Sequence, residues 1–111
     1  LCHNSSAYFV DCPMSTLSAP EREQLANAFK ALSSPNRLAM YLDLLEHEET
    51  AVSFCRLTDL IDRLEIGAPT VSHHLKELVN AGLIEVQRDG KFMRCRLNPD
   101  MRQRLAHFFC A

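Results

Sequence analysis

The chain has 111 residues, of which 47% are hydrophobic and 23% are charged, and its formal net charge is −2. This composition is typical of one globular domain, and it excludes a disordered tail, a collagen-like repeat and a supercharged segment. No apolar run approaches the roughly 18 residues that a membrane-spanning helix needs, so we expect no bilayer crossing and no membrane partner.

Residues 1–17 are polar and aperiodic, and they predict a flexible N-terminal arm ahead of a single domain over residues 18–111. The first helix is predicted to begin after Ser18, which is a suitable N-cap. Pro20 fits the first turn, and Glu21 stands three residues after the cap, as a capping box requires. The apolar residues at helical spacing are Leu25, Ala28, Phe29 and Leu32.

A second helix is predicted to begin at Pro35, with Ser34 as its cap. Its expected buried face consists of Leu38, Tyr41, Leu42 and Leu45. The acidic stretch over 47–50 predicts a loop.

Ser53 is the expected cap of a third helix, whose apolar positions are Leu57, Leu60, Ile61 and Leu64. Gly67 interrupts the pattern, and Pro69 opens a fourth helix, which we expect to end at Gly82. A gap of a few residues containing Gly is the spacing of a helix-turn-helix. The buried side of the fourth helix is predicted to be Val71, Leu75, Leu78 and Val79.

The periodicity then changes from helical to alternating over 84–88 and again over 92–97, with Asp89-Gly90 as a hairpin turn. Asn98-Pro99-Asp100 predicts the start of a last helix with the apolar face Met101, Leu105, Phe108 and Phe109. This order predicts a mainly α fold, a winged helix-turn-helix with the element sequence helix, helix, helix-turn-helix, two-stranded wing, helix.

The fourth helix carries a polar side suited to DNA. With its apolar residues facing inward, short hydrogen-bonding or cationic groups face outward, and these are Thr70, Ser72, His73 and Lys76. The wing is locally basic, with Arg88, Lys91, Arg94 and Arg96. A local cluster of cations is enough for phosphate contact despite the net charge of −2. The alternative is that these residues form an ordinary solvated surface.

The first and last helices carry more apolar surface than a small three-helix core easily covers: Phe29, Leu32, Leu105, Phe108 and Phe109. Pairing of these helices across a two-fold axis would cover it and present two recognition helices about one DNA turn apart. We therefore expect a homodimer, the alternative being that these residues close the monomer core.

Five cysteines without a CxxC spacing argue against a disulfide framework and a zinc ribbon, and we expect a cytoplasmic protein with reduced thiols. Cys95 is expected in the core. Cys55 is expected in the first turn of the third helix, where the helix dipole favours a thiolate. Cys2 and Cys12 on the arm could reach Cys55 of the partner subunit, and two or three thiolates suit a soft ion such as trivalent arsenic. Cys110 could instead form a disulfide with an arm thiol.

Four segments resemble the arsenic-repressor (ArsR/SmtB) family of bacterial winged-helix repressors: Ala31 to Leu38, Pro69 to Leu78, Ala81 to Ile84, and Arg88 to Lys91. The resemblance runs from about Phe29 to Leu97. It implies a homodimer that occupies double-stranded operator DNA and releases it when an inducer binds. By resemblance, Thr70, Ser72, His73 and Lys76 occupy base- and phosphate-contacting positions, whereas His74 packs against the protein.

The inducer sites of this family match only in part. Arg102 stands where a zinc site on the last helix would have its first His, so that site is expected to be absent. Related proteins often have a Cys-x-Cys motif just before an Asp-Leu pair, but here Arg56 and Thr58 precede Asp59-Leu60. The only thiol, Cys55, stands one residue further back, so the full motif is missing. Cys110 resembles one of the two thiols of persulfide-sensing members, but Leu42 replaces the other.

We therefore predict a repressor that requires no cofactor and is relieved by arsenite or another soft ion at Cys12, Cys55 and Cys2. The rival hypothesis is oxidation or persulfidation involving Cys110 and Cys12. A DNA-binding protein without an inducer is a third possibility. An enzyme with a Cys–His pair is not supported, because neither a Gly-rich loop nor a carboxylate pair accompanies His73 and His74.

Overall fold

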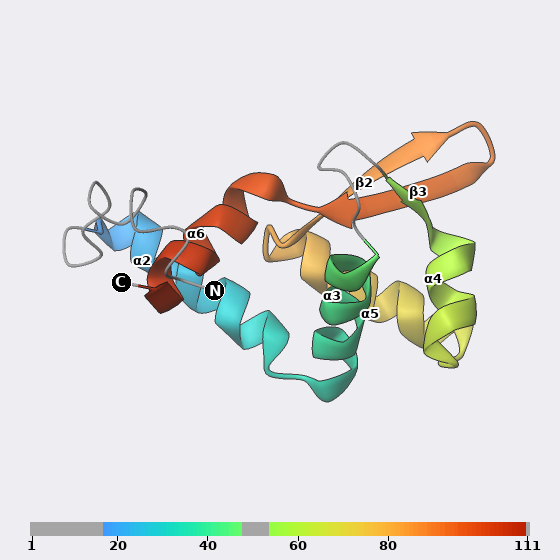
Figure 1. Ribbon diagram of the computed structural model, residues 1–111, viewed down its shortest axis with the longest axis horizontal. Coiled ribbons are helices and arrows are strands. Elements are labelled where there is room, and N and C mark those ends of the chain that lie inside the picture. Colours follow the sequence, from blue (N-terminus) through green and yellow to red (C-terminus); the bar gives the residue numbers. More distant parts are fainter. Residues whose placement is uncertain (1–16, 48–53, 111) are drawn as a thin grey trace.

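A computed structural model describes residues 17–47 and 54–110 of the chain. Within these ranges the fold is mainly helical with one small sheet at the end opposite α2 and α6 (Figure 1). The elements, in chain order, are α2 (Ala19–Leu32), α3 (Pro35–Glu46), β1 (Cys55–Arg56), α4 (Leu57–Leu64), α5 (Ala68–Asn80), β2 (Ile84–Asp89), β3 (Phe92–Leu97) and α6 (Pro99–Cys110). None of the helices in the described ranges is both long and apolar enough to span a bilayer.

Side-chain caps begin three of these helices where the sequence predicts them. At α2, Ser18 N–H donates to Glu21 Oε1 (3.0 Å) and Glu21 N–H donates to Ser18 Oγ (3.3 Å), which completes the capping box. Ser34 Oγ accepts from the first turn of α3. Asn98 Oδ1 accepts from the backbone of α6 at 3.0 and 3.2 Å. These bonds satisfy N–H groups that have no partner inside the helix.

The helix-turn-helix consists of α4 and α5, but its details differ from the prediction. α4 begins at Leu57 with Arg56 as N-cap and without a side-chain cap bond, so the expectation that Ser53 caps this helix is wrong. Glu65 ends α4 in the left-handed conformation at φ 55°, whereas Gly67 has φ −57° and serves as the N-cap of α5. The tight turn therefore depends on a non-glycine residue with positive φ, a conformation that sequence rules assign to glycine.

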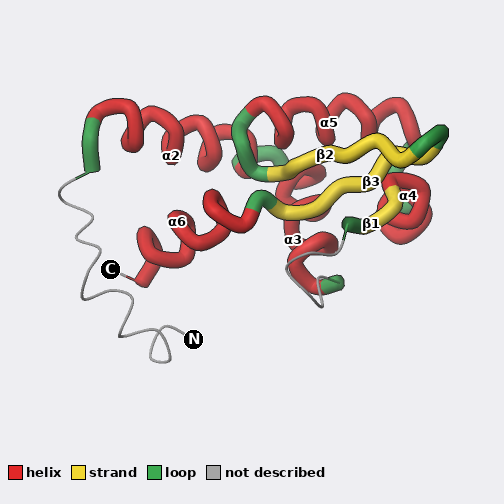
Figure 2. The backbone as a smooth tube through the Cα atoms, turned by 90° about the horizontal axis from the view of Figure 1, so that it is seen from above, coloured by secondary structure: helices red, strands yellow, loops and turns green. Residues whose placement is uncertain are grey.

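The wing is part of a three-stranded antiparallel sheet in the order β1-β3-β2, with β3 in the middle (Figure 2). Sequence reasoning predicted only the hairpin. Asp89 pairs with Phe92, so the two-residue loop is Gly90-Lys91, one position later than the predicted Asp89-Gly90 turn. Gly90 has φ 63°, a conformation that favours glycine. β1 adds the pairs Cys55–Cys95 and Arg56–Arg94 on the other edge of β3.

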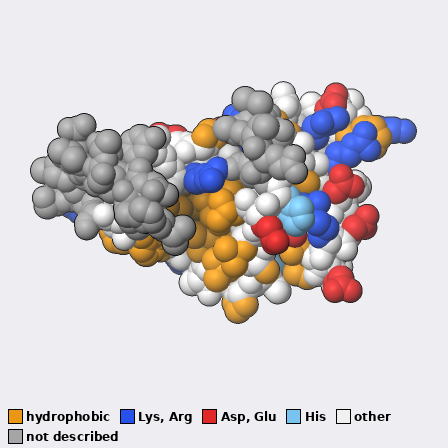
Figure 3. Space-filling model, in the orientation of Figure 1, with side chains coloured by type: hydrophobic (Ala, Val, Ile, Leu, Met, Phe, Trp, Pro, Cys, Tyr) orange, Lys and Arg blue, Asp and Glu red, His pale blue; other side chains and the backbone are white. Residues whose placement is uncertain are grey.

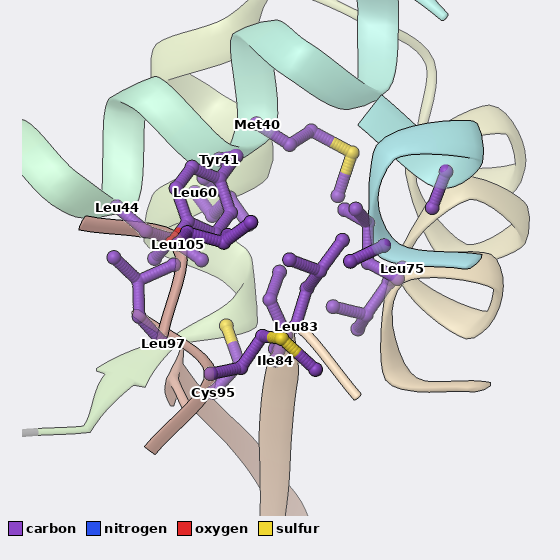
Figure 4. Close-up of a cluster of buried hydrophobic side chains, with 14 of the residues drawn as sticks. Met40, Tyr41, Leu44, Leu60, Leu75, Leu83, Ile84, Cys95, Leu97 and Leu105 are labelled. Atoms are coloured by element: carbon purple, nitrogen blue, oxygen red, sulfur yellow. The ribbon is translucent and has the colours of Figure 1, made fainter. Parts of the chain in front are cut away.

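The core lies where α3, α4 and α5 meet the sheet, and Figure 4 shows side chains of α3 among those of α5 and the strands. The predicted buried face of α3 is largely wrong. Tyr41 is buried as predicted, but the other buried residues of this helix are Met40 and Leu44, which were not predicted. The other three predicted residues are substantially exposed: Leu38 41%, Leu42 51% and Leu45 36%. Apolar residues lie on both sides of this helix, so periodicity alone does not determine which side packs.

α2 and α6 lie side by side at the end of the molecule away from the wing (Figure 1). Their contact contains three aromatic rings, with the Phe29 centroid 5.2 Å from that of Phe108 and 5.6 Å from that of Phe109. Met101 and Leu105 of α6 are buried as predicted, whereas Phe108 is 41% and Phe109 71% exposed. The outer part of this aromatic contact is therefore an apolar surface on the protomer.

Candidate nucleic-acid interface

α5 has one buried and one exposed side. Val71, Leu75 and Leu78 are buried in the core, as the sequence predicts. The four residues predicted to contact DNA are all exposed, and they are Thr70, Ser72, His73 and Lys76. They lie in the first nine residues of the helix and present hydroxyl, imidazole and ammonium groups to solvent, the groups that bind base edges and phosphates.

The N-terminus of α5 is open. Its N-cap is Gly67, which has no side chain to accept from the first turn, and Pro69 occupies the first turn without an N–H to donate. The remaining N–H groups of that turn therefore have no side-chain cap, and they carry the positive end of the helix dipole. Such a helix end is suited to a phosphate oxygen.

His74 packs against the protein instead of joining the exposed row. Its Nδ1 lies 3.4 Å from Arg37 Nη1, and Arg37 Nε donates to the carbonyl of Ala31 at 2.6 Å. Desolvation, followed by the charge of Arg37 and then that of His73, lowers the pKa of His74. A neutral imidazole that accepts at Nδ1 fits this geometry. His74 thus connects α5 to the junction between α2 and α3.

Two of the four wing arginines and lysines are neutralised within the hairpin. Arg94 Nη2 lies 3.2 Å from Asp89 Oδ2, and Arg96 Nε lies 2.8 Å from Glu85 Oε1. Across the described ranges, no carboxylate lies within salt-bridge distance of the other two cations, Arg88 and Lys91, which are exposed.

An aromatic ring supports the tip of the wing. The Arg56 guanidinium lies 4.3 Å and the Lys91 ammonium 5.6 Å from the centroid of the Phe92 ring. Figure 3 shows Lys and Arg side chains gathered around this end of the hairpin. The predicted contact residues Arg88 and Lys91 are therefore the wing cations with charge available for phosphates.

The cysteines are only partly within the described structure. Cys2 and Cys12 lie outside the described residues. Cys55 is a half-buried free thiol, but it lies in β1 and not in the first turn of a helix, so that expectation is wrong. Cys110 is disulfide-bonded, so the expectation of reduced thiols does not hold for this cysteine.

Cys95 is a buried free thiol, as predicted, and its burial raises its pKa to about 12. Its position opposite Cys55 was not predicted, because a two-residue strand leaves no alternation to detect. Within residues 17–47 and 54–110, no cluster of three or more His, Cys, Asp or Glu side chains is arranged to hold a metal ion.

A helix-turn-helix domain model matches residues 32–87, which is half of the chain. The chain is 33% identical over 93 residues to the HTH-type transcriptional repressor SmtB of Mycobacterium tuberculosis, covering 80% of this chain and 63% of that protein. It is 34% identical over 76 residues to the arsenical resistance operon repressor of Staphylococcus xylosus, covering 68% of this chain and 67% of that one.

Among solved structures, the homodimeric winged helix-turn-helix DNA-binding domain of a possible ArsR-family regulator from Mycobacterium bovis superposes with a TM-score of 0.65 at 22% identity. The match covers 86% of each chain and supports the same fold.

Proposed function

The chain belongs to the ArsR/SmtB family of winged helix-turn-helix regulators, and from this premise we propose a homodimeric repressor released from operator DNA by a thiol-binding inducer. The family consists of DNA-binding transcription regulators and not of enzymes. The chain spans about 63% of the length of its SmtB relative. The observation that carries the proposal is the exposed polar row on α5, opposite a fully packed side of the same helix.

In the proposed complex, the N-terminal half of α5 enters the major groove, which is wide enough for a helix. Ser72 and His73 then face base edges, while Thr70 and Lys76 reach the flanking phosphates. The wing lies beside the helix, with Arg88 and Lys91 on the backbone. His74 and Arg37 hold the helix from behind, so the recognition side chains project from a fixed support.

Homodimer formation is supported by the exposed aromatic surface on α2 and α6. Phe108 and Phe109 expose large parts of their rings beside Phe29, and single domains rarely leave such a patch uncovered without a partner. The neighbouring solved domain is homodimeric. A two-fold axis through this surface would place two copies of α5 on successive turns of the duplex, about 34–36 Å apart.

The DNA-binding proposal is tested by the affinity of the purified chain for a duplex that it selects from a random-sequence pool. His73→Ala and Lys76→Ala should each weaken binding, the former with loss of sequence preference and the latter about equally for all sequences. Lys30→Ala on α2 is the matched control, because it removes the same charge from another face. Unchanged binding by both α5 variants would contradict the proposed role of α5.

The proposed inducer is trivalent arsenic or another soft ion held by Cys12, Cys55 and Cys2. Cys55 supports this by being a free and partly accessible thiol, and the S. xylosus relative is an arsenical resistance operon repressor. Arsenite should release DNA from the reduced protein and add one arsenic to its mass with loss of thiol protons. Cys12→Ser and Cys55→Ser should each abolish this release, and release from both variants would exclude the site.

A redox mechanism is the second candidate, and the disulfide at Cys110 favours it. In this mechanism, an oxidant or a persulfide joins Cys110 to an arm thiol, for which Cys12 is our candidate, and the changed dimer releases DNA. Reaction of the reduced protein with a persulfide donor would then add sulfur or remove two hydrogens, and Cys110→Ser would prevent release. If neither arsenite nor the donor releases DNA, a repressor without a thiol inducer is the remaining interpretation.

A further inference from the structure

Two free thiols face each other across the edge of the sheet. Cys55 of β1 and Cys95 of β3 are direct cross-strand partners, so their side chains project from the same face of the sheet. Directly opposed residues in an antiparallel pair have Cβ atoms about 4.5–5.5 Å apart. A small pocket of about 110 Å³ is lined by both cysteines, with Phe54 and Arg96 in its wall.

We propose that Cys55 and Cys95 form a dithiol site that binds one divalent thiophilic ion per protomer between their two sulfurs. The spacing fits such an ion. With metal–sulfur bonds of about 2.3 Å, two sulfurs on opposite sides of an ion lie about 4.6 Å apart, which is close to the separation of about 4.5–5.5 Å between the Cβ atoms that carry them. The pocket beside Cys55 gives the ion a path to Cys95, whose own surface is fully covered.

The number of ligands selects the kind of ion. Over residues 17–47 and 54–110, no group of three or more His, Cys, Asp or Glu is arranged around a common point. His47 also lines the pocket, but its Nδ1 is 2.9 Å from the backbone carbonyl of Asp43. Zinc requires four ligands in a structural site, so two sulfurs alone do not hold it. Soft ions that accept two thiolates in a line are the class that fits.

Burial of Cys95 favours a neutral complex over a free thiolate. Cys95 is fully buried, and such surroundings are poor at solvating a charge. When a divalent ion binds, each thiol releases its proton to solvent and each sulfur bonds to the ion. No electrons are exchanged, two protons are released, and the ion with its two thiolates carries no net charge. The buried environment therefore does not penalise the product.

The site is one hydrogen bond away from the helix-turn-helix. Arg63 Nη2 in the last turn of α4 donates to Cys55 Sγ at 3.4 Å and lies 2.7 Å from Asp43 Oδ1 on α3. The hydrogen bond with Asp43 raises the pKa of Arg63, so the guanidinium remains charged. An ion on Cys55 would compete for the sulfur lone pairs that Arg63 contacts. This site deepens the proposed function, because it gives Cys55 a second thiol, Cys95, in the same protomer as the DNA-binding helices.

The test uses the full chain carrying Cys2→Ser, Cys12→Ser and Cys110→Ser, fully reduced, with Hg²⁺ as the probe and no DNA present. Native mass spectrometry should show one mercury per protomer with loss of two hydrogens, and the mercury–thiolate absorption should appear in parallel. Zn²⁺ added under the same conditions should not remain bound against a chelator.

The control is Cys55→Ser in the same background. Cys55 is half-buried, so this variant should keep the fold, and circular dichroism verifies that it does. Retention of mercury against glutathione should fall by about 10²–10⁴-fold, the advantage that a second tethered ligand provides. Equal retention by this variant, or one mercury shared by two protomers, would overturn the inference. Because DNA is absent, either result would leave the proposed role of α5 unaffected.

Discussion

Replacement of Lys91 by Gln should reduce the salt dependence of DNA binding by a calculable amount. On α5 and the hairpin, each protomer presents three cations without a carboxylate partner in the described ranges: Lys76 on α5, and Arg88 and Lys91 on the wing. A dimer that places all of them on phosphates makes six contacts. With a slope of about −0.9 per phosphate, log K should change with log[salt] with a slope of about −5. Affinity would then fall about 10³-fold between 50 and 200 mM salt.

Lys91→Gln removes two of these contacts from the dimer, so the slope should become shallower by about 1.8. Fluorescence anisotropy of a labelled duplex, titrated at four or five salt concentrations, measures this directly. Lys30→Gln on α2 makes the same change in net charge and should leave the slope unaltered. If Lys91→Gln has the wild-type slope, or Lys30→Gln reduces it equally, the wing does not contact phosphates as proposed.

Three further outcomes are expected, each measured by equilibrium unfolding at a fixed protomer concentration. Because the folded state lowers the pKa of His74, the unfolded chain binds more protons, so stability should fall as the pH decreases below about 6.5; His74→Gln should weaken this dependence. Gly82→Ala should lower the free energy of unfolding by about 1–2 kcal/mol, because φ is 79° at this position. The added Cβ itself has room, since its nearest contact is Met101 Cε at 3.7 Å. Gly67→Ala should lower the free energy of unfolding less, because φ is −57° there. Leu44→Ala should cost about 2–5 kcal/mol and Leu42→Ala less than half as much, and equal losses would contradict the packing of α3.

Local chemistry explains which predictions from sequence are confirmed. Ser18, Ser34 and Asn98 cap their helices because the hydroxyl or amide reaches an N–H only two or three residues away. Gly82 and Gly90 adopt positive φ at the end of α5 and in the wing loop. The helix-turn-helix and the hairpin follow from such short-range signals, and their order identifies the winged helix. The exposed side of α5 follows as well, because the apolar residues of this helix recur at helical spacing on one side only.

Features that depend on distant partners were missed or misplaced. β1 is a strand only because β3 accepts it as a neighbour, and its two residues have no pattern of their own. The pairing of Arg94 with Asp89 and of Arg96 with Glu85 requires the register of the hairpin. The predicted arm over residues 1–17, with Cys2 and Cys12, lies outside the described residues except for Leu17 and stays a prediction.

The amino-acid sequence by itself determines the order of the elements, the ends of most helices and the residues that α5 presents to solvent, because each depends on side chains within a few positions of one another. Only the tertiary structure decides which apolar side of α3 is buried, which wing cations remain available and that Cys55 faces Cys95. These features depend on which surfaces and strands meet in space, and the sequence of a short segment does not show which distant residues will pack against it.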